Sequence, residues 1–286
     1  MPAFKPSDFD NTNKIQWCPG CGDFPILFSV KNALAKLGIP NHETCIVSGI
    51  GCAGKLPHYV KTYGFESIHG RSLPTAAAIK MANNRLNVLA VGGDGDGYGI
   101  GMGHFIHIMR RNFDLVYIVH NNQIYGLTKG QTSPTSETGF KTNSTPRGAI
   151  EVPVNPMALA IASGATFVAR GFSGDLNHLS ELIVRGIQHR GFSLIDVFQP
   201  CISFNKVNTY QYFMKNTYKI DETSHNIRDK MKAMTLAMQT DKLPIGVFYE
   251  EERETYNDEL VALKKAPLVN HDISDVDIKG VLETYL

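Results

Sequence analysis

Short apolar runs alternate with longer stretches of helical periodicity along most of the chain. The apolar runs predict strands at 45–48, 87–91, 115–120, 166–169 and 193–198. The periodic stretches predict helices at 26–37, 74–83, 104–111, 156–164 and 176–190. Strands that alternate with helices are typical of a parallel sheet covered on both faces. The sequence therefore predicts a doubly wound α/β fold with a mostly parallel sheet.

Two regions depart from this alternation. Residues 131–151 are rich in Thr, Ser, Pro and Gly and lack periodicity, which predicts a long functional loop. From Cys201 onward the pattern weakens, and one helix is expected at 226–238. The end of the chain is charged and irregular, so we expect a tail that packs against another surface.

Composition and charge exclude several classes of protein. The 286 residues, 43% of them hydrophobic, can bury a large core. With 28 basic and 27 acidic residues, the net charge of +1 gives no electrostatic basis for binding nucleic acid or a membrane surface. No apolar run approaches the roughly 20 residues that a membrane span needs, and the N-terminus lacks an apolar signal segment. We expect a cytoplasmic protein that binds neither nucleic acid nor membrane.

A glycine-rich segment at 88–103 includes and follows a predicted strand. Such turns let backbone amides approach phosphate groups closely. No register of these glycines satisfies the G-x-G-x-x-G fingerprint, which disfavours a nicotinamide cofactor. Asp94 and Asp96 would repel a bare diphosphate unless a divalent cation lies between the carboxylate and the phosphates. The segment therefore predicts a diphosphate that is bound through Mg²⁺.

A second glycine-rich loop, at 49–55, matches the G-x-x-x-x-G-K pattern of ATP-binding loops. That pattern requires Ser or Thr as the next residue to bind Mg²⁺, whereas this chain has Leu56. We interpret the match as coincidental and do not expect an ATPase.

Four of the five cysteines form a pattern. Cys18 and Cys21 form a C-x-x-C turn, while Cys52 and Cys201 lie in loops that follow predicted strands. Cys45 lies within an apolar strand and is expected to be a core residue. Four thiolates suit either zinc or an iron–sulfur cluster. Structural zinc more often uses two local C-x-x-C turns, so the spacing favours the cluster without excluding zinc.

The sequence Gly93-Asp94-Gly95, followed by Asn121-Asn122 at the end of the next strand, resembles the motif of thiamine-diphosphate enzymes. The resemblance implies that Mg²⁺ is bound by the carboxylate of Asp94, the side-chain oxygen of Asn122 and the carbonyl of Ile124. The alternative is a tight turn and a polar loop without a ligand. The strand-turn-helix-strand context favours the motif.

Six segments, in chain order, resemble the β subunits of 2-oxoacid:ferredoxin oxidoreductases over roughly residues 15–205. They are 17–22, 49–52, 69–71, 93–96, 125–131 and 200–201. The resemblance implies one [4Fe-4S] cluster bound by Cys18, Cys21, Cys52 and Cys201. It also implies contacts to thiamine diphosphate by Ile50, Gly51, Cys52, Ala53, His69, Gly95, Asp96, Gly126 and Leu127. A cofactor-binding domain is thus expected at 1–200, with an N-terminal cluster-binding loop, and a C-terminal extension at 201–286 that packs on it and on a partner subunit.

The resemblance also implies a reaction and partners. The family decarboxylates a 2-oxoacid oxidatively in the presence of coenzyme A and reduces ferredoxin. The glutamate that activates the aminopyrimidine of the cofactor lies outside the diphosphate-binding half, so we expect it on a separate α subunit and expect the isolated chain to be inactive. Two alternatives stay open: a pyruvate or indolepyruvate enzyme, and a zinc-stabilised scaffold subunit without catalysis.

Two lysines bear on the substrate. Lys55 follows the loop that carries Cys52, and Lys129 follows the cofactor loop, which predicts that both face the substrate. Two cationic groups suit 2-oxoglutarate, which has two carboxylates where pyruvate has one. The segment 127–130 also resembles members that accept 2-oxoglutarate. We therefore expect conversion of 2-oxoglutarate to succinyl-CoA, or the reverse; the alternative is that both lysines are merely solvated.

Overall fold

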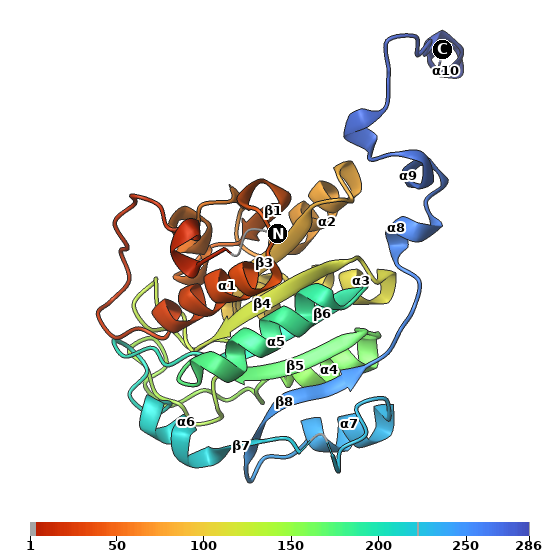
Figure 1. Ribbon diagram of the computed structural model, residues 1–286. Coiled ribbons are helices and arrows are strands. Elements are labelled where there is room, and N and C mark those ends of the chain that lie inside the picture. The colour runs from red at the N-terminus through yellow and green to blue at the C-terminus, as the bar shows by residue number, and fades with distance from the viewer. Residues whose placement is uncertain (1–3, 222, 286) are drawn as a thin grey trace.

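The computed structural model describes residues 4–221 and 223–285 as one eight-stranded sheet with helices on both faces (Figure 1). The strand order is β2-β1-β3-β4-β6-β5-β8-β7. The strands are β1 (Thr44–Ser48), β2 (Tyr63–Glu66), β3 (Asn87–Gly93), β4 (Leu115–Asn121), β5 (Phe167–Phe172), β6 (Phe192–Phe198), β7 (Thr217–Lys219) and β8 (Leu243–Glu250). The predicted mostly parallel α/β fold is confirmed.

The five predicted strands correspond to β1, β3, β4, β5 and β6. These five strands pair with one another in parallel, whereas β8 is antiparallel to β5. The sequence analysis missed β2, β7 and β8. Every residue of β2 is exposed, so this strand has no apolar run to detect. Pro244 and Gly246 interrupt the apolar pattern of β8, and both residues weaken a strand prediction.

The described part of the chain also contains ten α-helices and several short helical turns. The helices are α1 (Asp23–Leu37), α2 (Ser72–Ala82), α3 (Met102–Arg111), α4 (Pro156–Ser163), α5 (Leu176–Gln188), α6 (Tyr210–Asn216), α7 (Lys230–Ala237), α8 (Tyr256–Glu259), α9 (Val261–Lys265) and α10 (Lys279–Glu283). The first five match the predicted helices. The helix expected at 226–238 is shorter, because Asp229 caps its start by accepting hydrogen bonds from the backbone N–H groups of Met231 and Lys232.

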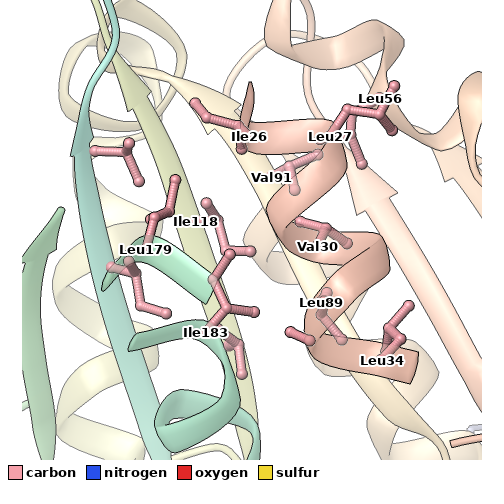
Figure 2. Packing of buried hydrophobic residues seen from close by; sticks show 14 of the residues in the cluster. Ile26, Leu27, Val30, Leu34, Leu56, Leu89, Val91, Ile118, Leu179 and Ile183 are labelled. Atoms are coloured by element: carbon pink, nitrogen blue, oxygen red, sulfur yellow. The ribbon is translucent and has the colours of Figure 1, made fainter. Parts of the chain in front are cut away.

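Two apolar cores lie on opposite faces of the sheet, because successive strand residues point to opposite sides. Ile46 of β1 joins the core under α1 and α5, whereas Cys45 and Val47 join the core under α2, α3 and α4. Cys45 is thus a core residue, as predicted. Figure 2 shows the first core, where α1 and α5 contribute Ile26, Leu27, Val30, Leu34, Leu179 and Ile183, and the strands contribute Leu89, Val91 and Ile118. Each such side chain contributes roughly 1.5–3 kcal/mol when fully buried.

The parallel arrangement brings the predicted motifs to one edge. Strands β1, β3, β4 and β6 run in the same direction, so their carboxyl ends meet there. The loops that leave from this edge begin at Gly49, Asp94, Asn122 and Gln199. Open parallel sheets bind ligands at this edge. The candidate site therefore lies where β1, β3, β4 and β6 end.

Two further regions flank the sheet. The loop predicted at 131–151 is confirmed, since it contains neither helix nor strand apart from an isolated bridge at Gln131. After β8 the chain leaves the body of the molecule through α8 and α9 and ends in α10 (Figure 1). In the described ranges, no helix has the length and apolar character needed to cross a membrane.

Candidate active site

A cavity of about 640 Å³ opens at the carboxyl edge of the sheet. This volume is within the usual range for a small-molecule or cofactor site. Its lining includes every residue that was predicted to contact the cofactor: Ile50, Gly51, Cys52, Ala53, His69, Gly95, Asp96, Gly126 and Leu127. The predicted Mg²⁺ ligands Asp94, Asn122 and Ile124 line the same cavity.

Asp94 lies at the end of β3, where the chain turns into the short helix Gly95–Ile100. Its side chain is 1% exposed, and one carboxylate oxygen accepts a hydrogen bond of 2.6 Å from Thr135 Oγ1. Burial raises the pKa of Asp94 to about 6, although the hydroxyls of Ser133 and Thr135 act in the opposite direction. Keeping this carboxylate charged inside the cavity is unfavourable by itself, and a bound cation would offset that cost.

The turn after β3 must be glycine because the loop after β4 packs across it. A Cβ atom at Gly95 would lie 2.1 Å from Cε1 of Tyr125. The hydroxyl of Tyr125 donates a hydrogen bond of 3.1 Å to the carbonyl of Gly95. The two halves of the predicted cofactor motif are therefore in direct contact.

The loop after β4 presents Asn122 and Ile124 to the cavity. Gly93 is paired with His120 across the sheet, which brings Asp94 and this loop together. Gln123, between the two predicted ligands, has a φ of 58°. This left-handed conformation turns the chain sharply, so that both Asn122 and Ile124 line the cavity. The three oxygen donors fit Mg²⁺, which prefers carboxylate, amide and carbonyl oxygens.

Asp96 connects three loops around the cavity. One of its oxygens accepts hydrogen bonds from the backbone N–H groups of Ile50, at 3.0 Å, and Gly70, at 2.8 Å. The same oxygen lies 2.9 Å from Nδ1 of His69. Burial raises the pKa of Asp96, and these hydrogen bonds lower it. Asp96 and His69 therefore fix the loop geometry on the β1 side of the cavity.

The cysteines of the predicted cluster lie beside the cavity. A Cβ atom at Gly126 would lie 3.5 Å from Sγ of Cys201 and 3.8 Å from Sγ of Cys52. The pKa of Cys52 is raised to about 12, chiefly by burial, with smaller contributions from the carboxylate of Asp23 and the thiols of Cys201 and Cys18. Burial likewise raises the pKa of Cys21, and the nearby Cys201 thiol adds to this increase. Cys52 and Cys201 therefore lie in one region, and the amide of Gln199 connects Cys21 to it by donating a 3.2 Å hydrogen bond to the sulfur of Cys21.

This region does not have the geometry of a site for a single ion. Among the described residues, no group of three or more His, Cys, Asp or Glu side chains lies close enough together to bind one metal ion. Which metal group the four cysteines bind therefore stays a prediction from the sequence.

Family comparisons agree with this geometry. Residues 49–197 match the family described as thiamine pyrophosphate enzyme, C-terminal TPP binding domain, and residues 201–265 match the C-terminal family of the pyruvate ferredoxin oxidoreductase beta subunit. The 2-oxoacid:ferredoxin oxidoreductase subunit beta of Saccharolobus solfataricus is 46% identical over 274 residues, which cover 91% of this chain and 90% of the relative. The chain belongs to this family of β subunits. It is thus one subunit of an oxidoreductase and contains a thiamine-diphosphate-binding domain.

Two further proteins are similar to this β subunit. The 2-oxoglutarate oxidoreductase subunit KorB of Mycobacterium tuberculosis is 46% identical over 201 residues, which cover 70% of this chain and 54% of the relative. A solved structure of 2-oxoglutarate:ferredoxin oxidoreductase from Magnetococcus marinus, with 2-oxoglutarate, coenzyme A and succinyl-CoA bound, matches with a TM-score of 0.92. That match has 36% sequence identity and covers 100% of this chain and 97% of the solved one.

Sequence reasoning missed His120 in the cavity of this β subunit. The side chain is 1% exposed, and Nδ1 lies 2.6 Å from the carboxylate of Asp23. Its buried Nε2 has no hydrogen-bond partner among the described residues. The thiol of Cys21 also donates to Asp23, at 3.3 Å, so one carboxylate connects the cysteine region with the cavity. His120 directly precedes Asn121 of the cofactor motif, and this position in the sequence could have identified it.

Thr135 was also missed, although the loop that contains it was predicted to be functional. Its hydroxyl contacts both Asp94 and Asn121 from a position far along the chain. The amide of Asn121 donates to the buried carboxylate of Asp196, so this side chain is held beneath the cavity. A pattern of Thr, Ser and Pro residues does not reveal which hydroxyl reaches the site.

The two lysines that were predicted to contact the substrate are not among the described residues that line the cavity. Lys55 is half-buried beside Cys52, and its charge partly offsets the effect of burial on the pKa of that thiol. It lines a separate hollow with Lys14 and His58. Lys129 is exposed and has a φ of 74°. Their role in substrate binding therefore remains a prediction that depends on the complete enzyme.

Proposed function

We propose that this β subunit, together with an α subunit, decarboxylates 2-oxoglutarate oxidatively in the presence of coenzyme A and reduces ferredoxin. The observation that carries this proposal is the position of Cys52. Cys52 lines the cofactor cavity. Its sulfur and the sulfur of Cys201 both lie beside Gly126. An electron acceptor held by these thiols would therefore adjoin the bound cofactor.

Asp94, Asn122 and the carbonyl of Ile124 would bind Mg²⁺ together with the diphosphate of the cofactor. The buried carboxylate and the two further oxygens that line the cavity support this assignment. When bound, thiamine diphosphate would supply the electron sink that decarboxylation of a 2-oxoacid needs. The chain itself orients this group by fixing the loops around it, chiefly through Asp96 and Tyr125.

Cys18, Cys21, Cys52 and Cys201 would bind a [4Fe-4S] cluster, which can accept electrons one at a time and pass them to ferredoxin. The sulfur atoms of Cys52 and Cys201, which lie beside the same glycine, support a shared metal group. All five cysteines are free thiols. Thiols of this kind persist in a reducing compartment, so we expect the enzyme in the cytoplasm.

An α subunit would cover the mouth of the cavity and bring the activating glutamate to it. Exposed apolar side chains stand at this mouth: Ile50 and Leu127 belong to the lining, Ile68 precedes His69, and Ile100 lies against Gly70. Apolar residues that surround a site in this way are typical of a protein interface. We propose further that the C-terminal extension at 201–286 packs on the cofactor domain and on the α subunit.

The substrate is proposed to be 2-oxoglutarate, with Lys55 and Lys129 as carboxylate-binding residues. The name of the KorB relative and the ligands of the solved neighbour support this choice over pyruvate and indolepyruvate. Lys55 lies three positions after Cys52, which lines the cavity. Both lysines would be desolvated when the α subunit closes the site.

One experiment tests the whole proposal. The chain is co-purified with its α subunit under anaerobic conditions, its absorption spectrum and iron content are recorded, and reduction of ferredoxin is assayed with a panel of 2-oxoacids. We expect a brown protein that reduces ferredoxin fastest with 2-oxoglutarate and requires coenzyme A. A colourless zinc protein would refute the catalytic role, and preference for pyruvate would refute the substrate assignment.

A further inference from the structure

The polar turn Ser133–Ser136 of the long loop lies directly against the proposed metal site. Thr135 is 3% exposed, and its hydroxyl donates a 2.6 Å hydrogen bond to the carboxylate of Asp94. The same oxygen lies 3.0 Å from Oδ1 of Asn121. Since a hydroxyl has one hydrogen to donate, the shorter contact to the charged group determines its direction. The hydroxyl therefore fixes one oxygen of Asp94.

The same turn also holds the second half of the metal site. Gln123 Nε2 donates to the carbonyl of Thr135 at 3.2 Å, and the hydroxyl of Ser136 donates to the carbonyl of Gln123 at 2.7 Å. Gln123 has the left-handed conformation that directs Asn122 and Ile124 into the cavity. A residue other than glycine keeps this conformation only when its surroundings enforce it. The turn thus restrains both elements that carry the proposed ligands.

Among the described residues, the hydrogen bonds of the remainder of the loop stay within the loop itself, as in the 2.7 Å bond from the N–H of Gly139 to the carbonyl of Ala149. Residues 137–147 are mostly exposed and contain neither helix nor strand. Within this part, the hydroxyl of Thr138 donates a 2.8 Å hydrogen bond to the carbonyl of Glu151, which is not a residue of the site. The order of the exposed part therefore depends on the buried turn that precedes it.

We propose that Thr135 is a positioning residue that couples binding of the metal and diphosphate to ordering of the loop 131–151. This inference rests on the proposed function, because it assumes that Asp94 binds Mg²⁺. If the anchored loop prepares the carboxylate for the cation, thermodynamic reciprocity requires that the bound cation stabilises the anchored loop by the same free energy. The loop would then be more ordered in subunits that have bound the cofactor.

The test compares Thr135→Val, which removes the hydroxyl at nearly constant volume, with Thr135→Ser, which keeps it. Thr138→Val is the matched control, since it removes a hydroxyl of the same loop that does not face the site. All are prepared as complete complexes with the α subunit and freed of cofactor with a chelator. Calorimetry measures binding of thiamine diphosphate in the presence of Mg²⁺. Limited trypsin digestion at the exposed residues Lys141 and Arg147 reports loop order with and without cofactor.

We expect Thr135→Val to weaken Mg²⁺-dependent binding of thiamine diphosphate roughly 10- to 100-fold, as is usual when a group that hydrogen-bonds a metal ligand is lost. The cofactor should slow digestion of the wild-type loop and of Thr135→Ser and Thr138→Val, but not that of Thr135→Val. Wild-type affinity in Thr135→Val would overturn the proposal. If that variant does not fold, the wild type alone decides, because digestion at an unchanged rate with cofactor would also overturn it. A wild type that binds no thiamine diphosphate would instead refute the proposed function.

Discussion

At the scale of single residues, Asp94 is the group on which we expect binding of the cofactor to depend most. Asp94→Asn removes the negative charge but retains an oxygen and nearly the same volume. We expect Mg²⁺-dependent binding of thiamine diphosphate to fall more than about 100-fold, beyond the loss expected for a group that only supports a ligand. Isothermal titration calorimetry measures this affinity. The visible absorption of the proposed cluster should be retained, because the cysteines proposed to bind it are separate from Asp94.

The matched control for this change is Asp272→Asn, which alters an exposed carboxylate of the C-terminal region. It should leave the affinity for the cofactor unchanged. If Asp94→Asn also binds thiamine diphosphate with wild-type affinity, Asp94 is not a metal ligand.

Cysteine substitutions separate the proposed cluster ligands from the core. Cys201→Ser should abolish the visible absorption and the reduction of ferredoxin, because a hard hydroxyl oxygen poorly replaces a thiolate on iron. Cys45→Ser should retain both, since Cys45 lies in the apolar core on the other face of the sheet. Iron analysis and absorption spectra of the anaerobically purified complexes measure the difference. Normal iron content in Cys201→Ser would contradict the assignment.

Lys129 tests how the substrate is recognised. Removing one charge-assisted contact to a carboxylate should cost roughly 1.5–3 kcal/mol, which corresponds to about a ten- to hundredfold loss of specificity. Lys129→Ala should show this loss in kcat/KM for 2-oxoglutarate and little change for pyruvate. Steady-state reduction of ferredoxin with both substrates provides the comparison. Equal losses for the two substrates would mean that Lys129 does not bind the distal carboxylate.

At the scale of elements, the packing of the loop after β4 across the turn after β3 explains why that turn contains glycine. Gly95→Ala would introduce a Cβ atom 2.1 Å from the ring of Tyr125, which must then move into the cavity or away from it. Overpacking of this kind costs roughly 1–3 kcal/mol. We expect Tm to fall by several degrees and the affinity for thiamine diphosphate to decrease, as measured by calorimetry.

Gly103→Ala provides the control within the next helix. A Cβ atom at Gly103 would have no neighbour within 4 Å among the described atoms, so the helix gains stability by roughly 0.5–1 kcal/mol. Its Tm should therefore rise slightly or stay constant. A fall in Tm in Gly103→Ala as large as that in Gly95→Ala would show that the contact with Tyr125 is not the cause.

At the scale of the whole molecule, the C-terminal tail after Ala266 has apolar side chains that are exposed to solvent. Val269, Ile273, Val276, Ile278, Val281 and Leu282 are each more than half exposed. A chain shortened to end at Ala266 keeps both apolar cores, so its Tm should stay close to that of the full chain. If the tail packs on the α subunit, this chain should form the complex more weakly, as measured by co-purification and size-exclusion chromatography. Unchanged assembly would contradict a role of the tail at that interface.

The sequence by itself determined the features that depend on neighbouring residues. The alternation of apolar runs and periodic stretches predicted β1, β3, β4, β5 and β6 with the helices between them, because burial on both faces requires this pattern. Short motifs such as Gly93-Asp94-Gly95 indicated the cavity, since parallel strands bring their carboxyl ends to one edge. Strands without an uninterrupted apolar run, such as β2 and β8, could not be identified in this way.

Only the tertiary structure decided which polar side chains meet. Thr135 contacts Asp94 across 41 positions of sequence, and His120 contacts Asp23 across 97. Neither pair has a local signature, because hydrogen bonds between distant residues depend on the packing of whole elements. The structure also placed Lys55 and Lys129 outside the cavity lining that the chain forms by itself. The sequence therefore determined the fold and the chemical character of the site, whereas packing decided which residues support it.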